Sequence, residues 1–183
     1  MKNRSLAFLA CILMITLSIA SCNSSTRSNE TNNEQVADQA TNDQENGTNV
    51  QQTKGILSTY FELKDALVAT DAASAKKAAE SLYTQLEGES HEVSETIAAK
   101  ARAIADNDDI EAQRTYFFDL SEQMYAFVKA SGDHEETIYK QYCPMAFNNQ
   151  GAFWLSNREL VENPYFGDRM LHCGSVQETI AGK

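Results

Sequence analysis

The stretch that decides the fold is "GILSTYFELKDALVATD", residues 55–71. Its apolar residues recur every three or four positions. Ile56, Tyr60, Leu63 and Leu67 lie on one stripe, and Leu57, Phe61 and Val68 widen it. This period matches one face of an α-helix and not the strict alternation of a half-buried strand. We therefore predict an amphipathic helix that must pack its apolar face against other elements.

Three more segments with helical periodicity follow, at residues 72–88, 91–106 and 110–132. The expected N-caps are Asp71, Ser90 and Asp108, and the expected helix stops are Gly88 and Gly132. Asp108 with Glu111 three residues later resembles a capping box. Loops of two to four residues between four helices predict an antiparallel up-and-down four-helix bundle.

The character of the chain changes after Gly132. Residues 137–147 and 151–156 are typical of short extended segments, with a turn at 148–151 between them. Residues 157–171 indicate a short helical turn, broken at Asn163-Pro164 and at Gly167. The predicted fold class is therefore mainly α: an antiparallel four-helix bundle with an irregular C-terminal extension that contains short strands.

The N-terminus predicts export. Lys2 and Arg4 precede an apolar run over residues 6–20, which has the length of a secretory signal and is short for a membrane span. The run ends in Ile19-Ala20-Ser21-Cys22, which fits the bacterial lipobox, with Cys22 acylated. The alternative is an ordinary signal cut near Ala20. Two or three acyl chains on Cys22 would attach the chain lastingly to a membrane of the cell envelope.

These features divide the chain into a lipoprotein signal peptide (1–21), a disordered tether (22–53) and one folded domain (54–183). The tether is rich in Asn, Gln, Thr, Ser and Glu and has too few apolar residues to offset the entropy of ordering. The net charge of −11 for the whole chain argues against nucleic acid as a partner and against electrostatic adhesion to anionic lipid.

Sulfur ligands are concentrated in a C-terminal motif at about residues 138–175. "QYCPMAFNNQGAFWLS" (141–156) and "GDRMLHCG" (167–174) contain Cys143, Met145, Trp154, Met170, His172 and Cys173. Thiolate and thioether are soft ligands that favour Cu(I). Imidazole from His172 or His134 could complete such a site, and Trp154 could lie over the bound cation. Zinc is less favoured, because thioether is a poor zinc ligand and no second cysteine pair is present.

A disulfide is the competing interpretation of the same residues. Cys11 leaves with the signal and Cys22 is acylated, so Cys143 and Cys173 are the remaining candidates for each other in an oxidising envelope. A Cys143–Cys173 disulfide would close a loop of about 30 residues and stabilise the domain by roughly 3–4 kcal/mol. It would also remove both thiolates from any metal site. The residues alone leave both interpretations open.

Enzyme motifs are lacking in the sequence. It contains no Cys-x-x-Cys pair, no Gly-x-Ser-x-Gly elbow, no phosphate-binding glycine loop and no His-Glu-x-x-His helix. His91 and His134 are interpreted as surface residues, and the acidic runs at 106–109 and 135–136 as caps and solvated loop charges. We expect no enzymatic activity.

The C-terminal motif resembles an uncharacterised family of bacterial envelope domains of unknown function. That family occurs as stand-alone lipoproteins and on periplasmic adaptor subunits of heavy-metal efflux pumps of the resistance–nodulation–division type. The resemblance covers roughly residues 54–175, and its specific part is 142–174. The matching residues are Cys143, Pro144, Met145, Ala146, Gly151, Trp154, Leu155, Ser156, Asn163, Pro164, Tyr165, Gly167, Met170, Cys173 and Gly174. The family supplies no established ligand residues; it implies neighbours that handle copper, silver or similar ions.

Together these observations predict a lipid-anchored envelope protein, on the periplasmic side, that binds Cu(I) or a related soft ion. Its ligands would be Cys143, Met145, Met170 and Cys173, with His172 as an additional candidate. A heavy-metal efflux adaptor is the expected protein partner. The alternative is a structural or protein-interaction module with a Cys143–Cys173 disulfide and no metal.

Overall fold

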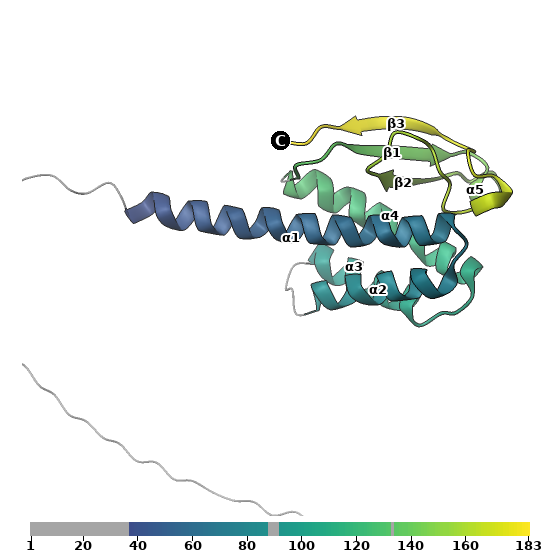
Figure 1. Ribbon diagram of the computed structural model, residues 1–183, viewed down its shortest axis with the longest axis horizontal. Helices are drawn as coiled ribbons and strands as arrows, with labels where there is room; N and C mark the ends of the chain where they lie inside the picture. Colours follow the sequence, from purple (N-terminus) through teal and green to yellow (C-terminus); the bar gives the residue numbers. More distant parts are fainter. Residues whose placement is uncertain (1–36, 88–91, 133) are drawn as a thin grey trace, which may run out of the picture. The chain divides into compact units, whose positions relative to one another are not determined.

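The computed structural model describes residues 37–87, 92–132 and 134–183, with side chains from Gln51 onward. Within these ranges the chain is mainly helical and has a small antiparallel three-stranded sheet at its C-terminal end (Figure 1). All these elements belong to one compact unit, residues 36–183. The predicted signal peptide and the predicted lipidation site, Cys22, lie outside the described residues.

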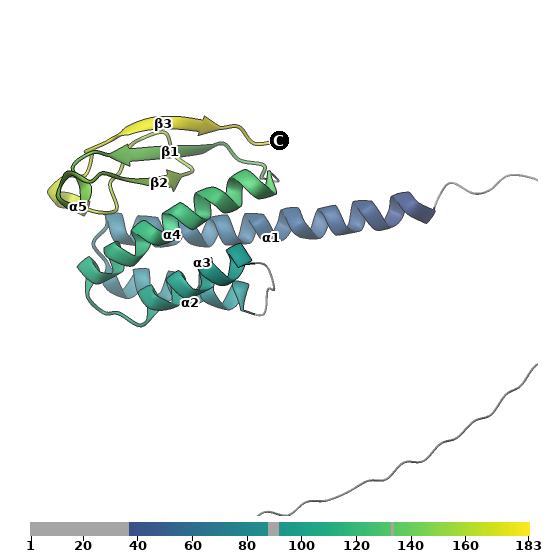
Figure 2. The same ribbon diagram turned by 180° about the vertical axis from the view of Figure 1, so that it is seen from behind.

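Four long helices form the first part of the unit. They are α1 (Ala37–Val68), α2 (Ala72–Leu86), α3 (Glu92–Ala105) and α4 (Ile110–Ser131). Each helix packs on the next along the chain, as the opposite views in Figures 1 and 2 show. The apolar stripe predicted from residues 55–71 is buried in this packing, and its four central side chains are at most 2 % exposed. The prediction of a mainly helical fold is therefore confirmed.

The helix ends follow ordinary capping chemistry. The carboxylate of Asp71 accepts a hydrogen bond from the backbone amide three residues later, at 3.0 Å, as predicted for an N-cap. At α4 the cap is Asp109 and not Asp108, so that prediction was wrong by one residue. Asp109 directly precedes the first helical residue, whereas Asp108 pairs with Lys76 at 2.7 Å. Gly132 ends α4 with a φ of 59°, which favours glycine. The predicted stop Gly88 and cap Ser90 lie outside the described residues.

Helix α1 begins earlier than the sequence indicated. It starts at Ala37, so residues 37–53, predicted to be part of a disordered tether, are helical (Figure 1). The segment contains no proline and continues a helix whose later turns pack on α2. Each further residue then adds a backbone hydrogen bond without a new nucleation cost. Among the residues whose side chains are described, from Gln51 onward, Thr53 is the first buried one, at 5 % exposed. Among the described residues, no helix is both long enough and apolar enough to cross a membrane.

The predicted extended segments form strands. β1 (Ile138–Cys143) and β2 (Ala152–Ser156) are antiparallel and are joined by a turn that contains the short helix α5 (Ala146–Asn149). The helical turn predicted after β2 is the 3-10 helix η1 (Gly167–Arg169), which Gly167 begins and does not break. A third strand, β3 (Ser175–Ile180), pairs with the other edge of β1 and was not predicted. The strand order is β2-β1-β3.

The sheet has two differently covered faces. Alternate residues of a strand point to opposite faces, so Lys140 of β1 lies on one face and Gln141 and Cys143 on the other. The Lys140 face lies towards α4, because the ammonium is 4.0 Å from the ring centre of Tyr125 on that helix. The other face is covered by the segment between β2 and β3, where Gln141 donates to the carbonyl of Arg158 at 2.9 Å. The Cys143 side chain is therefore on the face covered by this segment.

One core connects the helices with the sheet. Tyr60 of α1 stacks on Phe117 of α4 with ring centres 5.3 Å apart. The Tyr60 hydroxyl lies 2.8 Å from Ser121 Oγ and accepts a hydrogen bond from the backbone amide of Leu155 in β2. Burial raises the pKa of this hydroxyl, so it remains protonated and available as a donor. The sheet is thus attached to the same core that holds the helices.

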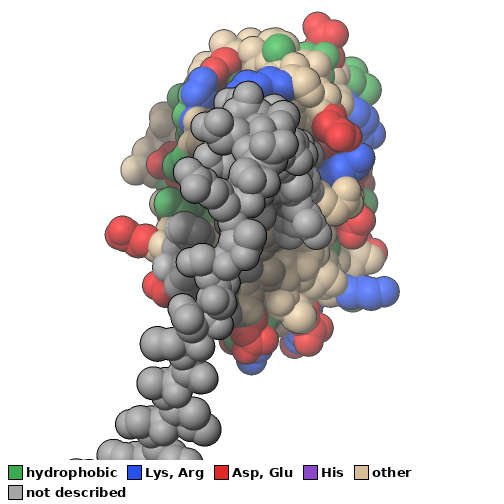
Figure 3. Space-filling view, turned by 90° about the vertical axis from the view of Figure 1, so that its left-hand side faces the viewer, with side chains coloured by type: hydrophobic (Ala, Val, Ile, Leu, Met, Phe, Trp, Pro, Cys, Tyr) green, Lys and Arg blue, Asp and Glu red, His purple; other side chains and the backbone are tan. Residues whose placement is uncertain are grey.

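The surface carries charges of both signs. Figure 3 shows acidic and basic side chains side by side on one face of the molecule. Several of these charges pair across elements, for example Lys100 of α3 with Asp119 of α4 at 2.6 Å. Such exposed pairs contribute about 0–1 kcal/mol each, so stability rests mainly on the core.

Candidate functional site: a pair of cysteine thiols

The fold brings Cys143 and Cys173 together. Cys143 is the last residue of β1, and Cys173 lies just before β3. Because these strands are antiparallel neighbours, with Tyr142 opposite Ser175, the end of one adjoins the start of the other. The two Sγ atoms are 2.9 Å apart, and both cysteines are free thiols. The two cysteine side chains are therefore in contact.

The two thiols differ in their access to solvent. Cys143 is completely buried, whereas Cys173 is only partly buried. The hydrogen bond that the Cys173 thiol donates to Cys143 raises the pKa of Cys173 to about 11, and burial and then the charge of Cys143 act in the same direction. At neutral pH Cys173 is therefore a protonated thiol. Reagents and exchanging ligands can reach it before they reach Cys143.

The two methionines of the predicted ligand set are placed differently. Met170 follows η1, is partly buried and accepts a hydrogen bond from the amide of Cys173 through its backbone carbonyl, at 3.1 Å. Met145 lies in the turn after β1 and is 48 % exposed. Met170 is thus tied to the segment that carries Cys173, while the Met145 side chain is directed to the surface.

His172 is exposed, and its ring is held by one contact. Nδ1 lies 2.8 Å from the backbone carbonyl of Val161. A carbonyl only accepts, so Nδ1 carries the proton and the lone pair remains on Nε2. Metal-binding histidines commonly have their second nitrogen held in this way. The structure therefore leaves His172 chemically able to act as a ligand at the surface.

Trp154 is a core residue. Its side chain has no exposed surface, and its ring packs edge-on against Tyr165 with centres 5.9 Å apart. The other side is closed by Gly174, where an added Cβ would lie 3.2 Å from Trp154 Cη2. Both environments leave no face open to a cation, so we omit Trp154 from the candidate ligands.

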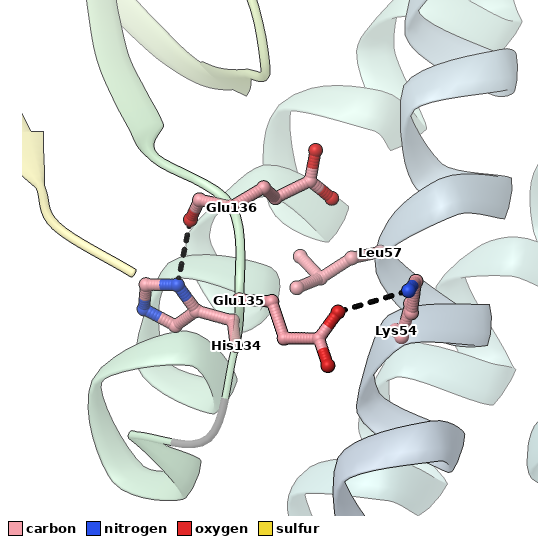
Figure 4. A pocket seen from close by; sticks show the side chains of 5 residues that line it. All are labelled: Lys54, Leu57, His134, Glu135 and Glu136. Atoms are coloured by element: carbon pink, nitrogen blue, oxygen red, sulfur yellow. Dashed lines mark hydrogen bonds and ion pairs between the residues drawn. The ribbon is translucent and has the colours of Figure 1, made fainter. Parts of the chain in front are cut away.

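His134 precedes β1, at the opposite end of that strand from Cys143, and β1 alone spans roughly 17 Å at the usual rise per residue. It is only 6 % exposed, in contrast to the surface position predicted for it. It lines a pocket of about 200 Å³ with Lys54, Leu57, Glu135 and Glu136 (Figure 4). Lys54 pairs with Glu135 at 2.9 Å, and the His134 ring is held by the Glu136 carbonyl. This pocket is separate from the thiol pair.

Within the described part of the chain, no group of three or more His, Cys, Asp or Glu residues is arranged to hold a metal ion. The predicted ligand set is therefore only partly assembled. The structure brings the two cysteines into contact, keeps Met170 on the adjoining segment, and leaves Met145 and His172 at the surface.

Two buried amides near the thiols were not recognised as important from the sequence. Gln141 donates from Nε2 to three consecutive carbonyls, those of residues 158–160, at 2.9–3.2 Å. Asn163 donates from Nδ2 to the carbonyl of Cys173 at 2.8 Å. The dipeptide Asn163-Pro164 was interpreted only as a helix break. Its actual contacts connect positions far apart in the sequence, which local patterns do not encode.

Comparison with known proteins finds a match between part of the helical region and a family model. A domain of the family described as "Protein of unknown function (DUF3347)" is found at residues 56–136. The match begins in α1 and ends before β1, so it includes neither Cys143 nor Cys173. The resemblance inferred from the sequence had its specific part at 142–174, outside this match. No curated protein and no solved structure matches the chain.

Proposed function

We propose that this chain is a lipid-anchored protein of the cell envelope that binds a soft metal ion, such as Cu(I) or Ag(I), between Cys143 and Cys173. The observation that carries the proposal is the convergence of the two thiols, with Sγ atoms 2.9 Å apart. Thiolates are preferred ligands of such ions. The role is binding and transfer, in heavy-metal homeostasis or efflux, and not catalysis.

The thiol chemistry favours a cation at this position. Two neighbouring thiolates repel each other, and the raised pKa of Cys173 indicates that its thiol keeps its proton without a cation. A soft cation replaces that proton and offsets the repulsion. Because thiolates and not thiols are the reactive form, the protonated Cys173 thiol also oxidises slowly. Met170, three residues before Cys173 on the same segment, would supply a thioether to complete the coordination.

The exposed ligands fit transfer of the ion to a partner. Cys173 is the accessible member of the pair, and Met145 and His172 are exposed. We propose that these surface groups exchange ligands with a heavy-metal efflux adaptor. Helices α1 to α4 would serve as an antiparallel four-helix scaffold for docking, and acylation of Cys22 would keep the chain at the membrane, most simply on its periplasmic face.

Anaerobic titration with Cu(I) against a competing chelator tests this proposal. The full chain would carry Cys11→Ser and Cys22→Ser, so that only the two candidate thiols remain. We expect one Cu(I) per chain, release of protons on binding, and tighter binding as pH rises, because protons compete with the metal. Adding Cys143→Ala and Cys173→Ala should abolish this binding, while His134→Ala, at the far end of β1, should leave it unchanged. Equal binding by the double cysteine variant would contradict the proposal.

The second candidate function is a structural or protein-interaction module stapled by a Cys143–Cys173 disulfide. It is favoured by the same 2.9 Å approach, which is closer than two unbonded sulfur atoms prefer. Oxidation would require only a small movement of either side chain to the S–S bond length of about 2.05 Å. Alkylation in denaturant of protein taken directly from the envelope, without reductant, separates the candidates. Two modified thiols favour the metal site, and none favours the staple.

A further inference from the structure

The geometry points to Asn163 as the positioning residue that holds Cys173 beside Cys143. This inference rests on the proposed function of the cysteine pair and assigns a role to the Asn-Pro-Tyr sequence, which that function does not use. Asn163 contacts neither sulfur. It acts on the backbone that carries one of them.

Asn163 connects two turns of the segment that covers the sheet. Its side chain is completely buried. Oδ1 accepts hydrogen bonds from the amides of Tyr165 and Phe166, at 2.8 and 3.2 Å, and so shapes the first turn. The Asn163 backbone amide donates to Leu171 at 2.8 Å, in the second turn. The two halves of this residue therefore bind turns that are separated by η1.

The remaining contact is directed at Cys173. Asn163 Nδ2 donates to the Cys173 carbonyl at 2.8 Å, and the Cys173 amide donates to Met170 at 3.1 Å. The peptide groups on both sides of the Cys173 Cα are thus held by hydrogen bonds. Cys143 is already fixed by its pairing with Ala152 in the β1–β2 ladder, and Tyr142 before it pairs with Ser175 of β3. When Cys173 is fixed as well, its thiol is kept close to the Cys143 thiol, which gives the two groups a high effective concentration for reaction with each other.

The first turn is itself anchored to the rest of the molecule. The Tyr165 hydroxyl donates to the Phe153 carbonyl of β2 at 2.6 Å, and Arg114 of α4 donates to the Pro164 carbonyl at 2.9 Å. The turn that Asn163 shapes is therefore held in place by both β2 and α4. Through its hydrogen bond to the Cys173 carbonyl, Asn163 in turn holds Cys173 in place relative to these elements.

The substitution Asn163→Asp isolates this role. Asp has nearly the same shape and keeps the oxygen that accepts from Tyr165 and Phe166. It replaces the Nδ2 donor with an oxygen that repels the Cys173 carbonyl. Gln113→Glu is the matched control: Gln113 is equally buried and donates from Nε2 to two carbonyls, but it lies in α4 and binds Ala72 and Asn107. Both variants lose buried amide hydrogen bonds, and only one of them touches Cys173.

The experiment measures the equilibrium between dithiol and disulfide in metal-free full chain, in glutathione redox buffers with a chelator present. Cys143 and Cys173 are read individually by differential alkylation and peptide mass spectrometry. One cysteine thiol attacks glutathione disulfide, forms a mixed disulfide and releases one glutathione. The other cysteine thiol then attacks the mixed disulfide, forms the Cys143–Cys173 disulfide and releases the second glutathione. We expect Asn163→Asp to lower the equilibrium constant about tenfold, the usual effect of one lost buried hydrogen bond. Gln113→Glu should change this equilibrium constant less than about twofold, because Gln113 has no contact with Cys173 and the substitution affects only the helical part of the fold.

An unchanged constant in Asn163→Asp would overturn the inference, and so would an equal fall in both variants, which would show general destabilisation. If Asn163→Asp does not fold by circular dichroism, Asn163→Ser replaces it, because serine keeps an oxygen acceptor and loses the donor without adding charge. No metal is present in this measurement. A failure of Cu(I) binding in the titration above therefore leaves this test intact, and a failure here leaves the metal proposal standing.

Discussion

The guanidinium of Arg114 in α4 donates from Nε to the carbonyl of Pro164 at 2.9 Å, and this bond ties the segment covering the sheet to the helices. The same guanidinium donates from Nη2 to the Leu67 carbonyl and to Thr70 Oγ1, both at 3.0 Å, at the end of α1. Nη1 pairs with Glu111 at 2.8 Å. Arg114 is only 2 % exposed, so one buried cation organises the junction of α1, α4 and the C-terminal segment.

Replacement of Arg114 by alanine should therefore destabilise the protein strongly. The loss leaves the Pro164 carbonyl without this donor and the Leu67 carbonyl with the Thr70 amide, at 3.2 Å, in place of two donors, and we expect the free energy of unfolding to fall by about 3–5 kcal/mol. Urea denaturation followed by circular dichroism measures the change. The exposed Arg102, paired with Asp106 one turn away, is the control. Arg102→Ala should change the stability little, because the pair is exposed, and a similar loss in both variants would contradict the role assigned to Arg114.

Gly167 should tolerate no side chain. Its φ is +55°, and an added Cβ would lie 2.4 Å from Thr70 Oγ1 and 2.7 Å from Arg114 Nη2. Gly167→Ala combines backbone strain with a clash, and we expect it to lower the free energy of unfolding by about 2–4 kcal/mol. Gly55→Ala in α1 is a useful contrast, because helical propensity favours alanine by up to about 1 kcal/mol. Thermal unfolding of both variants compares them, and a neutral Gly167→Ala would show that the junction can relax.

The alkylation rate of Cys173 should report its contact with Cys143. With its pKa near 11, the thiol is almost fully protonated at pH 8 and should react slowly with iodoacetamide, with a rate that rises as pH approaches 11. Cys143→Ala removes the largest cause of the raised pKa. The value should then fall towards 9.0, and more thiolate should form at pH 8. We expect the rate at pH 8 to rise by roughly tenfold or more. An unchanged profile would show that Cys143 is not the cause.

The same shift predicts a change in stability at high pH. A thiol whose pKa is higher in the folded than in the unfolded state supports folding below the unfolded value and loses that contribution as pH rises towards the folded value. Stability of the wild type should accordingly decline between about pH 9 and 11. Cys143→Ala should reduce this decline, which urea titrations across that pH range can detect.

The attachment of β3 to α4 should depend on acid pH. Glu178 of β3 has its pKa lowered by the hydrogen bond from Tyr125, at 2.7 Å, and then by Lys129 at 3.0 Å. A lowered carboxyl pKa contributes stability above the unfolded value of about 4.5 and loses it as pH falls through the folded value. Amide exchange in β3, corrected for its intrinsic pH dependence, should therefore accelerate selectively below pH 4.5. In Glu178→Gln this selective acceleration should be absent; its persistence would place the titrating group elsewhere.

The sequence pattern predicted correctly those features that depend on a single helix. The stripe from Ile56 to Leu67, the cap at Asp71 and the stop at Gly132 all depend on residues within one or two turns, and each is found as predicted. The strand β3 was missed because its residues alternate between exposed and partly buried only when β3 is paired with the edge of β1. The early start of α1 was missed because the composition of residues 37–53 shows only that they are polar. Their helical structure depends on the later turns of α1, which pack on α2 and from which the helix extends.

By itself, the sequence determined that the chain is mainly helical, which faces of the helices are apolar, and that two cysteines and two methionines lie near its C-terminus. Only the tertiary structure decided which of these side chains meet. Cys143 and Cys173 are 30 positions apart and adjoin because two strands pair in register, while Met145, two residues from Cys143, is directed to solvent and Trp154 is enclosed. The physical reason is that helical periodicity is a local property of the chain, whereas the position of a side chain in a strand-and-loop segment depends on hydrogen bonds to distant residues such as Asn163 and Arg114.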